Sequence, residues 1–366
     1  MKIVLTGGGT GGHLVPLVTV AGEIKKKVPD ADFVFMGPNG KIELEILGPT
    51  GIRIRKIMSG KMRRYVSGYN FLDILKIPIG IIQALFWLLI EMPDAVFSKG
   101  GYASLPIVLV SWMYRIPVLI HESDSNPGMA NSMMAKFVER VAISYPEAEK
   151  YFPPEQVVFT GNPVRSDIRD GDPQNARQIY HFIDSKKVIF IQGGSLGARA
   201  INKRILDILP QLLHKYQVIH QTGDANFEEV KTKAGVLGIK AGRDGYFVMA
   251  FFGEEIKDIL AVSDLIISRA GAGTLSEIAA VKKPAIVIPL STAANNHQRM
   301  NAYSIAKNGG CLVLEEDNLG SHMLLDKIEE LMNNDELRQK MSERIGIYYH
   351  PDAAERIADG VLGMIK

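Results

Sequence analysis

The feature that most restricts the fold of this chain is an apolar segment followed by a glycine-rich turn, which occurs once in each half. The first copy occupies residues 3–12 and the second residues 188–198. In both, Val, Ile, Leu or Phe residues form a run of strand length, enter several glycines and lead into a helical stretch. This arrangement is typical of the first unit of a parallel α/β sheet, so two such sheets are expected.

Other apolar runs of strand length alternate with helical stretches throughout the chain, which indicates parallel strands joined by crossover helices. The predicted strands are 2–5, 32–36, 95–98, 118–121 and 157–160, then 188–192, 217–220, 246–249, 265–268 and 285–289. The predicted fold class is therefore α/β, with two doubly wound, Rossmann-like halves.

The length of 366 residues fits two domains of the usual size, roughly 100–200 residues each. A stretch rich in Pro, Asp and Gly, residues 163–173, separates the two series of strands. We expect a first domain over 1–162 and a second over 163–344, with an amphipathic tail, 345–366, that packs back on the first.

Composition argues against several kinds of protein. The net charge is only +2, from 42 basic and 40 acidic residues, so no overall field favours a nucleic acid as partner. A single cysteine, Cys311, rules out an internal disulfide and a metal site built from several cysteines. Because the N-terminus enters glycines without the apolar core of a signal peptide, the protein is expected inside the cell.

The most apolar window, residues 79–90, is shorter than the roughly 20 residues that cross a bilayer. Basic residues lie before and after it, a pattern that fits a peripheral protein on an anionic membrane surface. Pro78 and Gly80 are expected to delay the helix until about Ile81 and to leave 74–79 as a membrane-binding loop. A fully buried helix is the alternative for about half of these positions.

The first glycine-rich loop, residues 7–13, can point backbone amides at an anion. Gly7, Gly9 and Gly12 also match the dinucleotide-binding pattern, but the second strand ends without the acidic residue which that site requires. His13 follows the glycines, where it could take a proton from an acceptor hydroxyl. A tight turn with a capping histidine is the alternative.

A second candidate anion site is the glycine-rich run at 271–273, followed by a helix. Thr274 and Glu277 equally match a capping box, which would make Glu277 a helix cap. Ser195 in the other glycine loop and Arg165 in the linker could pair with a diphosphate, and the amides at 295–298 suit sugar hydroxyls. The D-x-D pattern at 30–32 precedes a strand as a polar turn and is attributed to chance.

Seven motifs in order resemble those of the MurG family, the peptidoglycan N-acetylglucosaminyltransferases of glycosyltransferase family 28. They are GGGTGGH at 7–13, SKGGYAS at 98–104, HESDSNPGMAN at 121–131, GNPVR at 161–165, GGSLGA at 193–198, SRAGAGTLSEIAA at 268–280 and NHQRMNA at 296–302. Each motif alone is weak, but their collinear order over nearly the whole chain is specific.

The resemblance implies a GT-B fold with two domains facing across a cleft. It also implies inverting transfer of N-acetylglucosamine from UDP-N-acetylglucosamine to undecaprenyl-pyrophosphoryl-N-acetylmuramyl-pentapeptide, without metal or cofactor, at the cytoplasmic face of the bacterial membrane. Glu122 competes with His13 for the role of general base. Asp124 departs from the family, in which Asn is common at that position.

The resemblance also assigns substrate-binding residues. Thr10, Gly11 and Gly12 face the donor sugar and the acceptor diphosphate, Asn131 contacts the donor sugar, and Arg165 and Ser195 lie on the diphosphate side. The helix start beneath a phosphate consists of Ala272, Gly273, Thr274, Leu275 and Ser276. By the same resemblance, Glu277 binds the ribose, Gln298 binds the sugar, and backbone near Gly253 binds the uracil.

Three other functions stay open on the sequence. A diacylglycerol glycosyltransferase would share the fold, the donor and the membrane, and would differ in its acceptor. A nucleotide-sugar sensor without turnover would not need His13. An NAD-dependent oxidoreductase is disfavoured by the second strand.

Overall fold

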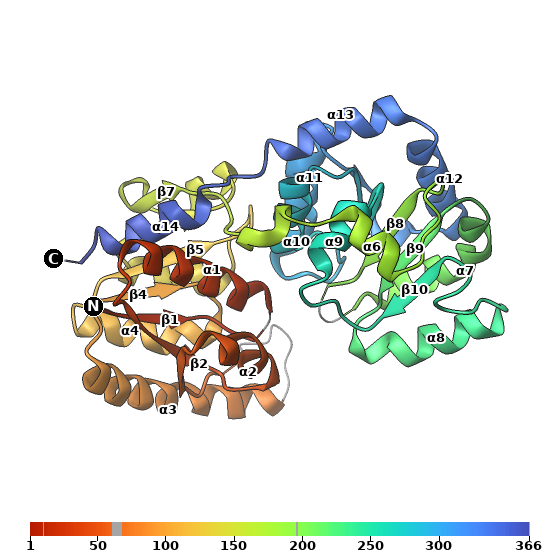
Figure 1. The fold of residues 1–366 in the computed structure, drawn as a ribbon. Helices are drawn as coiled ribbons and strands as arrows, with labels where there is room; N and C mark the ends of the chain where they lie inside the picture. The colour runs from red at the N-terminus through yellow and green to blue at the C-terminus, as the bar shows by residue number, and fades with distance from the viewer. Residues whose placement is uncertain (10, 61–67, 195–196, 366) are drawn as a thin grey trace. The chain divides into compact units, whose positions relative to one another are not determined.

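The computed structural model describes residues 1–365 except 10, 61–67 and 195–196, and for residues 68–75 it describes the backbone alone. The chain forms two compact units, Met1–Arg165 with His350–Lys366 and Ser166–Tyr349. Each unit is a parallel sheet with helices on both faces (Figure 1). The predicted α/β fold class is therefore confirmed.

The first unit contains a seven-stranded sheet in the order β3-β2-β1-β4-β5-β6-β7. In chain order the strands are β1 (Lys2–Thr6), β2 (Asp32–Gly37), β3 (Arg53–Lys56), β4 (Ala95–Ser98), β5 (Val118–Glu122), β6 (Arg140–Ile143) and β7 (Val157–Phe159). All neighbouring strands pair in parallel. From the boundary between β1 and β4, successive strands are added first toward one edge of the sheet and then toward the other. Ligands bind at this switch point in folds of this kind.

Helices cover both faces of this sheet, because alternate strand residues point to opposite sides. Ile3 and Leu5 face α1 and α14, whereas Val4 faces α3, α4 and α5. The helices are α1 (Gly11–Lys27), α2 (Lys41–Leu47), α3 (Gly68–Glu91), α4 (Leu105–Met113), α5 (Met129–Met134) and α14 (Ala353–Leu362). The last of these packs on α1, so the end of the chain completes the core of the first unit.

The second unit repeats the design with a six-stranded parallel sheet in the order β10-β9-β8-β11-β12-β13. Its strands are β8 (Val188–Gln192), β9 (Gln217–Gln221), β10 (Tyr246–Met249), β11 (Leu265–Ser268), β12 (Ala285–Val287) and β13 (Leu312–Val313). Its helices are α6 (Pro173–Ile179), α7 (Arg199–Lys215), α8 (Phe227–Val236), α9 (Ile256–Val262), α10 (Ala272–Val281), α11 (His297–Ala306), α12 (Ser321–Met332) and α13 (Asp335–Gly346). The equivalent switch point lies between β8 and β11.

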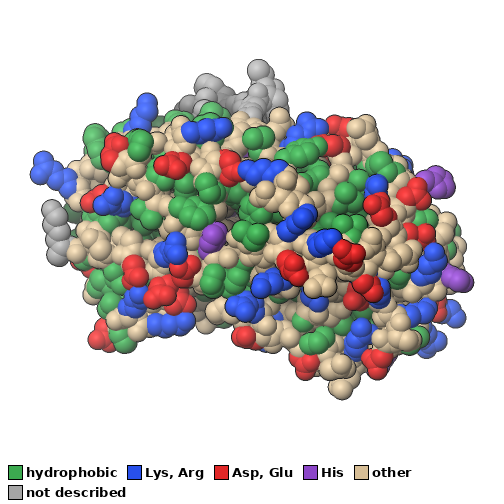
Figure 2. Space-filling view, turned by 90° about the horizontal axis from the view of Figure 1, so that it is seen from above, with side chains coloured by type: hydrophobic (Ala, Val, Ile, Leu, Met, Phe, Trp, Pro, Cys, Tyr) green, Lys and Arg blue, Asp and Glu red, His purple; other side chains and the backbone are tan. Residues whose placement is uncertain are grey.

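Every segment predicted as a strand is a strand in the structure, whereas β3, β6 and β13 were not predicted. Acidic and basic side chains are interspersed over the face drawn in Figure 2, in keeping with the small net charge.

The expectation of a loop over 74–79 is wrong. Helix α3 runs without a break from Gly68 to Glu91 and contains Pro78. Gly80 does not delay the start of the helix but is needed for close packing, since a Cβ there would lie 2.2 Å from the Met58 carbonyl oxygen. The apolar window is therefore part of one long helix, which buries Ala84 and Leu88 and exposes Ile82 and Phe86. No described helix has the length and hydropathy to cross a bilayer.

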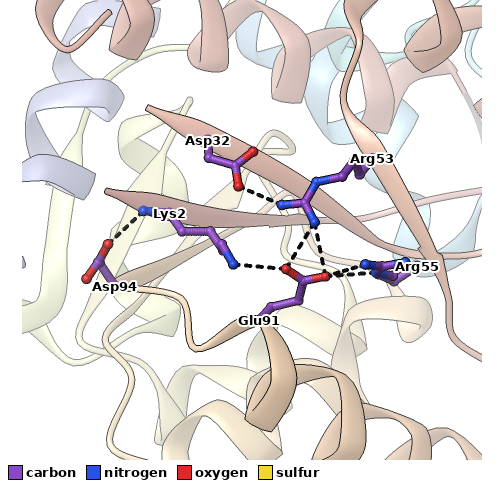
Figure 3. Close-up of polar contacts among 6 residues, drawn as sticks. All are labelled: Lys2, Asp32, Arg53, Arg55, Glu91 and Asp94. Carbon is purple, nitrogen blue, oxygen red and sulfur yellow. Dashed lines mark hydrogen bonds and ion pairs between the residues drawn. The ribbon is translucent and has the colours of Figure 1, made fainter. Parts of the chain in front are cut away.

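A buried carboxylate fastens the end of α3 to the sheet (Figure 3). The side chain of Glu91 is 2% exposed and forms ion pairs with Lys2 of β1 at 3.1 Å and with Arg53 and Arg55 of β3 at 3.3 and 2.8 Å. Burial acts to raise the pKa of Glu91, but hydrogen bonds from Arg55 and Lys2 outweigh it and hold the pKa below its usual range. Asp32, in the D-x-D pattern, pairs with Arg53 at 2.6 Å.

Candidate active site

The loops at the switch point of the first sheet bring together chemistry-bearing residues from distant motifs. His13 lies in the first turn of α1, Lys99 follows β4, and Glu122 ends β5. Because all the strands are parallel, their carboxyl ends meet at one edge. Gly11 and Gly12 are the first two residues of α1 and directly precede His13. Thr10 lies outside the described residues.

His13 is half-buried, and the backbone N–H of Gly8 donates to its Nδ1 at 3.4 Å. Desolvation, helped by the positive charge of Lys99, lowers the pKa of His13 to about 4. The ring is therefore neutral at pH 7. While the contact with Gly8 lasts, the ring proton sits on Nε2, so the imidazole must both release Gly8 and change tautomer before Nε2 can accept a proton.

Glu122 is buried and already bonded through both carboxylate oxygens. Oε1 accepts from the N–H of Asp124 at 2.9 Å, while Oε2 accepts from the N–H of Gly128 at 3.1 Å and from Nδ2 of Asn131 at 2.9 Å. Burial and the charge of Asp124 nevertheless raise the pKa of Glu122 to about 7. The carboxylate thus holds the 123–131 segment together, which is a structural role the sequence did not suggest.

Asn131 is placed by close packing against the glycine pair after β4. Gly100 has φ of +85°, and a Cβ there would lie 2.1 Å from Oδ1 of Asn131, so only glycine fits. Oδ1 itself is buried without a hydrogen-bond partner. A buried acceptor without a partner at the switch-point edge of the sheet is consistent with a ligand contact.

Two further residues of this edge were missed from the sequence. Glu43 of α2 is buried and accepts from the N–H groups of Gly9 at 3.2 Å and Gly40 at 3.0 Å, so it fixes the first glycine loop. The Lys99 ammonium is buried with no hydrogen-bond partner. Burial lowers its pKa to about 8, against the opposing effect of Glu122. A lysine just after an apolar strand was the available signal.

In the second unit, the start of α10 offers backbone amides to an anion. Helix α10 begins at Ala272 after Gly271, with no side-chain cap and no acidic residue in the first turn. The capping-box explanation of Glu277 is therefore wrong, because Thr274 lies inside the helix rather than at its N-cap. Gly273 and Thr274 are partly exposed there.

The next positions of α10 face inward. Leu275 is 1% exposed, and the Ser276 hydroxyl donates to the Ala272 carbonyl at 2.8 Å. The Leu275 N–H also donates to the Gly271 carbonyl at 3.0 Å, so the amides that can meet a ligand lie earlier in the helix. Glu277 is half-buried.

The other predicted residues are placed as follows. Oε1 of Gln298 accepts from the Leu290 N–H at 2.9 Å, so a sugar would meet its amide nitrogen. The Gly253 N–H donates to Glu255 at 2.9 Å. Arg165 is half-buried and belongs to the first unit, and Ser195 lies outside the described residues. Within the described part of the chain, no three His, Cys, Asp or Glu side chains form a metal-binding group.

Two doubly wound parallel units, each with a glycine-rich turn at its switch point, define the GT-B class of fold. The model of the glycosyltransferase family 28 N-terminal domain matches residues 3–143, and that of the C-terminal domain matches residues 188–357. The chain therefore belongs to glycosyltransferase family 28.

Curated relatives share most of their length with this chain. The UDP-N-acetylglucosamine–N-acetylmuramyl-(pentapeptide) pyrophosphoryl-undecaprenol N-acetylglucosamine transferase of Clostridium perfringens is 38% identical over 92% of this chain and 91% of its own. The transferase of that name numbered 2 in Bacillus anthracis is 37% identical over 92% of each chain.

Solved structures show the same architecture. MurG of Acinetobacter baumannii has a TM-score of 0.75 and 25% identity over 99% of both chains. The UDP-GlcNAc 2-epimerase of Neisseria meningitidis, solved with UDP-GlcNAc, shares the fold at 14% identity with a TM-score of 0.69 over 99% of this chain and 100% of its own.

Proposed function

We propose that this protein transfers N-acetylglucosamine from UDP-N-acetylglucosamine to undecaprenyl-pyrophosphoryl-N-acetylmuramyl-pentapeptide, with inversion at the anomeric carbon. The observation that carries the proposal is the start of α10, whose first-turn amides have neither a side-chain cap nor an acidic neighbour. Such a helix end suits the diphosphate of a sugar nucleotide. The names of the relatives supply the sugar and the acceptor.

In the proposed reaction, the C4 hydroxyl of the muramyl sugar attacks the anomeric carbon of the donor. A carbon–oxygen bond forms on one side as the bond to the UDP oxygen breaks on the other, so the configuration inverts. Amides of Ala272, Gly273 and Thr274 stabilise the negative charge that develops on the leaving diphosphate. The hydroxyl proton passes to a base of the first unit.

His13 is the better candidate for that base. It is half-buried just after the first glycine-rich loop and is neutral at pH 7. The oxygens of Glu122, in contrast, already accept hydrogen bonds from three N–H groups. Glu122 then acts as a positioning residue for Asn131.

Transfer of radiolabelled N-acetylglucosamine tests the assignment directly. With EDTA present, we expect the purified chain to label the lipid-linked muramyl-pentapeptide and not diacylglycerol offered in parallel. Labelling of diacylglycerol alone would show that diacylglycerol, not the muramyl lipid, is the acceptor. Dependence of transfer on added divalent metal would contradict a mechanism based on backbone amides.

Membrane attachment at the cytoplasmic face is part of the proposal and rests on the outer side of α3. Large apolar side chains recur there at helical spacing and are exposed by 66% at Ile82, 57% at Phe86 and 63% at Leu89. Trp112, at the end of the adjacent α4, is 54% exposed. An apolar helix side with basic neighbours such as Lys76 and Arg115 suits an anionic lipid surface.

Sedimentation with phosphatidylglycerol vesicles checks this surface. The double substitution Ile82→Asp and Phe86→Asp should abolish co-sedimentation, because two carboxylates would have to enter the lipid interface. Val236→Asp, at an apolar position exposed by 83% in the second unit, is the control and should sediment like the wild type. Unchanged sedimentation of the double variant would exclude α3 as the anchor.

A further inference from the structure

One buried ion pair connects loops from three neighbouring strands of the second sheet. Arg269 follows β11 and donates through Nη2 to Oε1 of Glu316, which opens the short 3-10 helix η9 (Glu316–Asn318) after β13. Through Nη1, Arg269 also donates to the Ile288 carbonyl, just beyond β12, at 3.2 Å. The Arg269–Glu316 pair therefore joins the carboxyl ends of β11, β12 and β13.

The second oxygen of Glu316 extends this connection to the loop after β12. Oε2 accepts from both the N–H and the hydroxyl of Ser291, at 3.1 and 3.2 Å. The Arg269 and Glu316 side chains are only 10% and 14% exposed. Burial acts to raise the pKa of Glu316, but hydrogen bonds from Arg269 and Ser291 outweigh it and keep the carboxyl ionised.

Two of the three loops held by the pair, those after β11 and β12, lead into the candidate donor site. Arg269 is three residues before Ala272, where α10 presents its amides. Ser291 opens the loop that reaches Gln298, and Gln298 accepts from the N–H of Leu290, the residue just before that loop. Asn301, one turn further along α11, donates to the Ala270 carbonyl at 3.3 Å.

We propose that the Arg269–Glu316 pair is a positioning pair for the sugar nucleotide. It fixes the spacing between the α10 amides, which take the diphosphate, and the 291–298 loop, which takes the sugar, while touching neither group itself. This inference rests on the proposed donor site but not on the identity of the acceptor.

Glu316→Gln is the informative single variant, because it keeps the shape and removes the charge and one acceptor. We expect its KM for UDP-N-acetylglucosamine and its Kd by titration calorimetry to rise about tenfold or more, with the acceptor KM unchanged. Glu329→Gln is the matched control. It breaks an ion pair of 2.7 Å with Lys215, at the end of α7, outside the candidate site, and should leave the donor constants unchanged.

A double apolar variant, Arg269→Met with Glu316→Leu, separates positioning from stability. Packed apolar side chains often replace a buried ion pair without loss of stability. The unfolding midpoint of the double variant should therefore be closer to that of the wild type than the midpoint of Glu316→Gln is. We expect its donor affinity to stay weakened. Recovery of donor affinity in the double variant, or wild-type affinity in Glu316→Gln, would overturn the inference. Absence of transfer by a wild-type protein that still binds the donor would refute only the proposed reaction.

Discussion

Replacement of His13 by alanine is expected to lower kcat for sugar transfer by about a hundredfold or more, the usual effect of losing a general base. The variant should fold normally, because the imidazole is half-buried and makes only a long contact with Gly8. Steady-state rates at saturating donor and acceptor measure the effect. An unchanged kcat would show that a group other than His13 is the base, whereas absence of transfer by the wild type as well would favour a nucleotide-sugar sensor.

His13→Asn distinguishes proton transfer from loop positioning. Asparagine can still accept the Gly8 N–H but cannot take a proton at neutral pH. If His13 is the base, the asparagine and alanine variants should be equally slow. Recovery of most of the rate with asparagine would show that the side chain only orders the glycine loop.

The pH dependence of kcat/KM separates the two candidate bases, because this ratio reports ionisations of the free enzyme. A base works deprotonated, so activity is lost as the pH falls through its pKa. With His13 as base, the acidic limb should lie near its pKa of about 4. A limb near pH 7 that disappears in Glu122→Gln would assign the base to Glu122, whose pKa is about 7.

The largest expected effect on stability is at Glu91. Replacement by alanine leaves Lys2, Arg53 and Arg55 without their shared partner. Because these cations are 29%, 44% and 30% exposed and can be hydrated, we expect the free energy of unfolding to fall by about 1–3 kcal/mol, less than for a pair buried on both sides. Tryptophan fluorescence during urea unfolding reports this directly. The two tryptophans, Trp87 and Trp112, are both in the first unit.

The Glu91 contribution should also depend on pH. Its pKa is held below the unfolded value, so the stabilisation is present above the usual glutamate range and is lost as the pH falls through the folded pKa. Glu91→Gln should remove this acid-side dependence. Glu355→Gln, which breaks a half-exposed pair with Lys27, is the control and should shift the midpoint little. Similar midpoints for the two variants would contradict a special role for Glu91.

The sequence predicted the central strands because each buries both faces and is therefore apolar along its length. It did not predict β3, whose sequence Arg-Ile-Arg-Lys has only one apolar residue. Two of those charges are explained by Glu91, which lies far along the chain, so no local pattern could reveal them. At Pro78 the local rules predicted a break that does not exist, because α3 contains this proline inside a continuous helix.

The motifs located the candidate site but not the way its loops are held. Glu122 was proposed as a base, and only the three N–H groups it accepts reveal a structural role. Glu43 and the Arg269–Glu316 pair carry no signature, because their partners are backbone groups or side chains distant in sequence. Such contacts depend on tertiary proximity, which one sequence does not encode in any local pattern.

The return of α14 to the first unit has a consequence for how the protein is made. The second unit is one continuous segment, whereas the first is assembled from the two ends of the chain. During synthesis, all residues of the second unit are made before α14, so α1 lacks the side chains of Ile357 and Val361 that cover it for all of that time. The first unit therefore carries an uncovered apolar helix side until residues 353–362 have left the ribosome, and chaperone binding would be most useful in that interval.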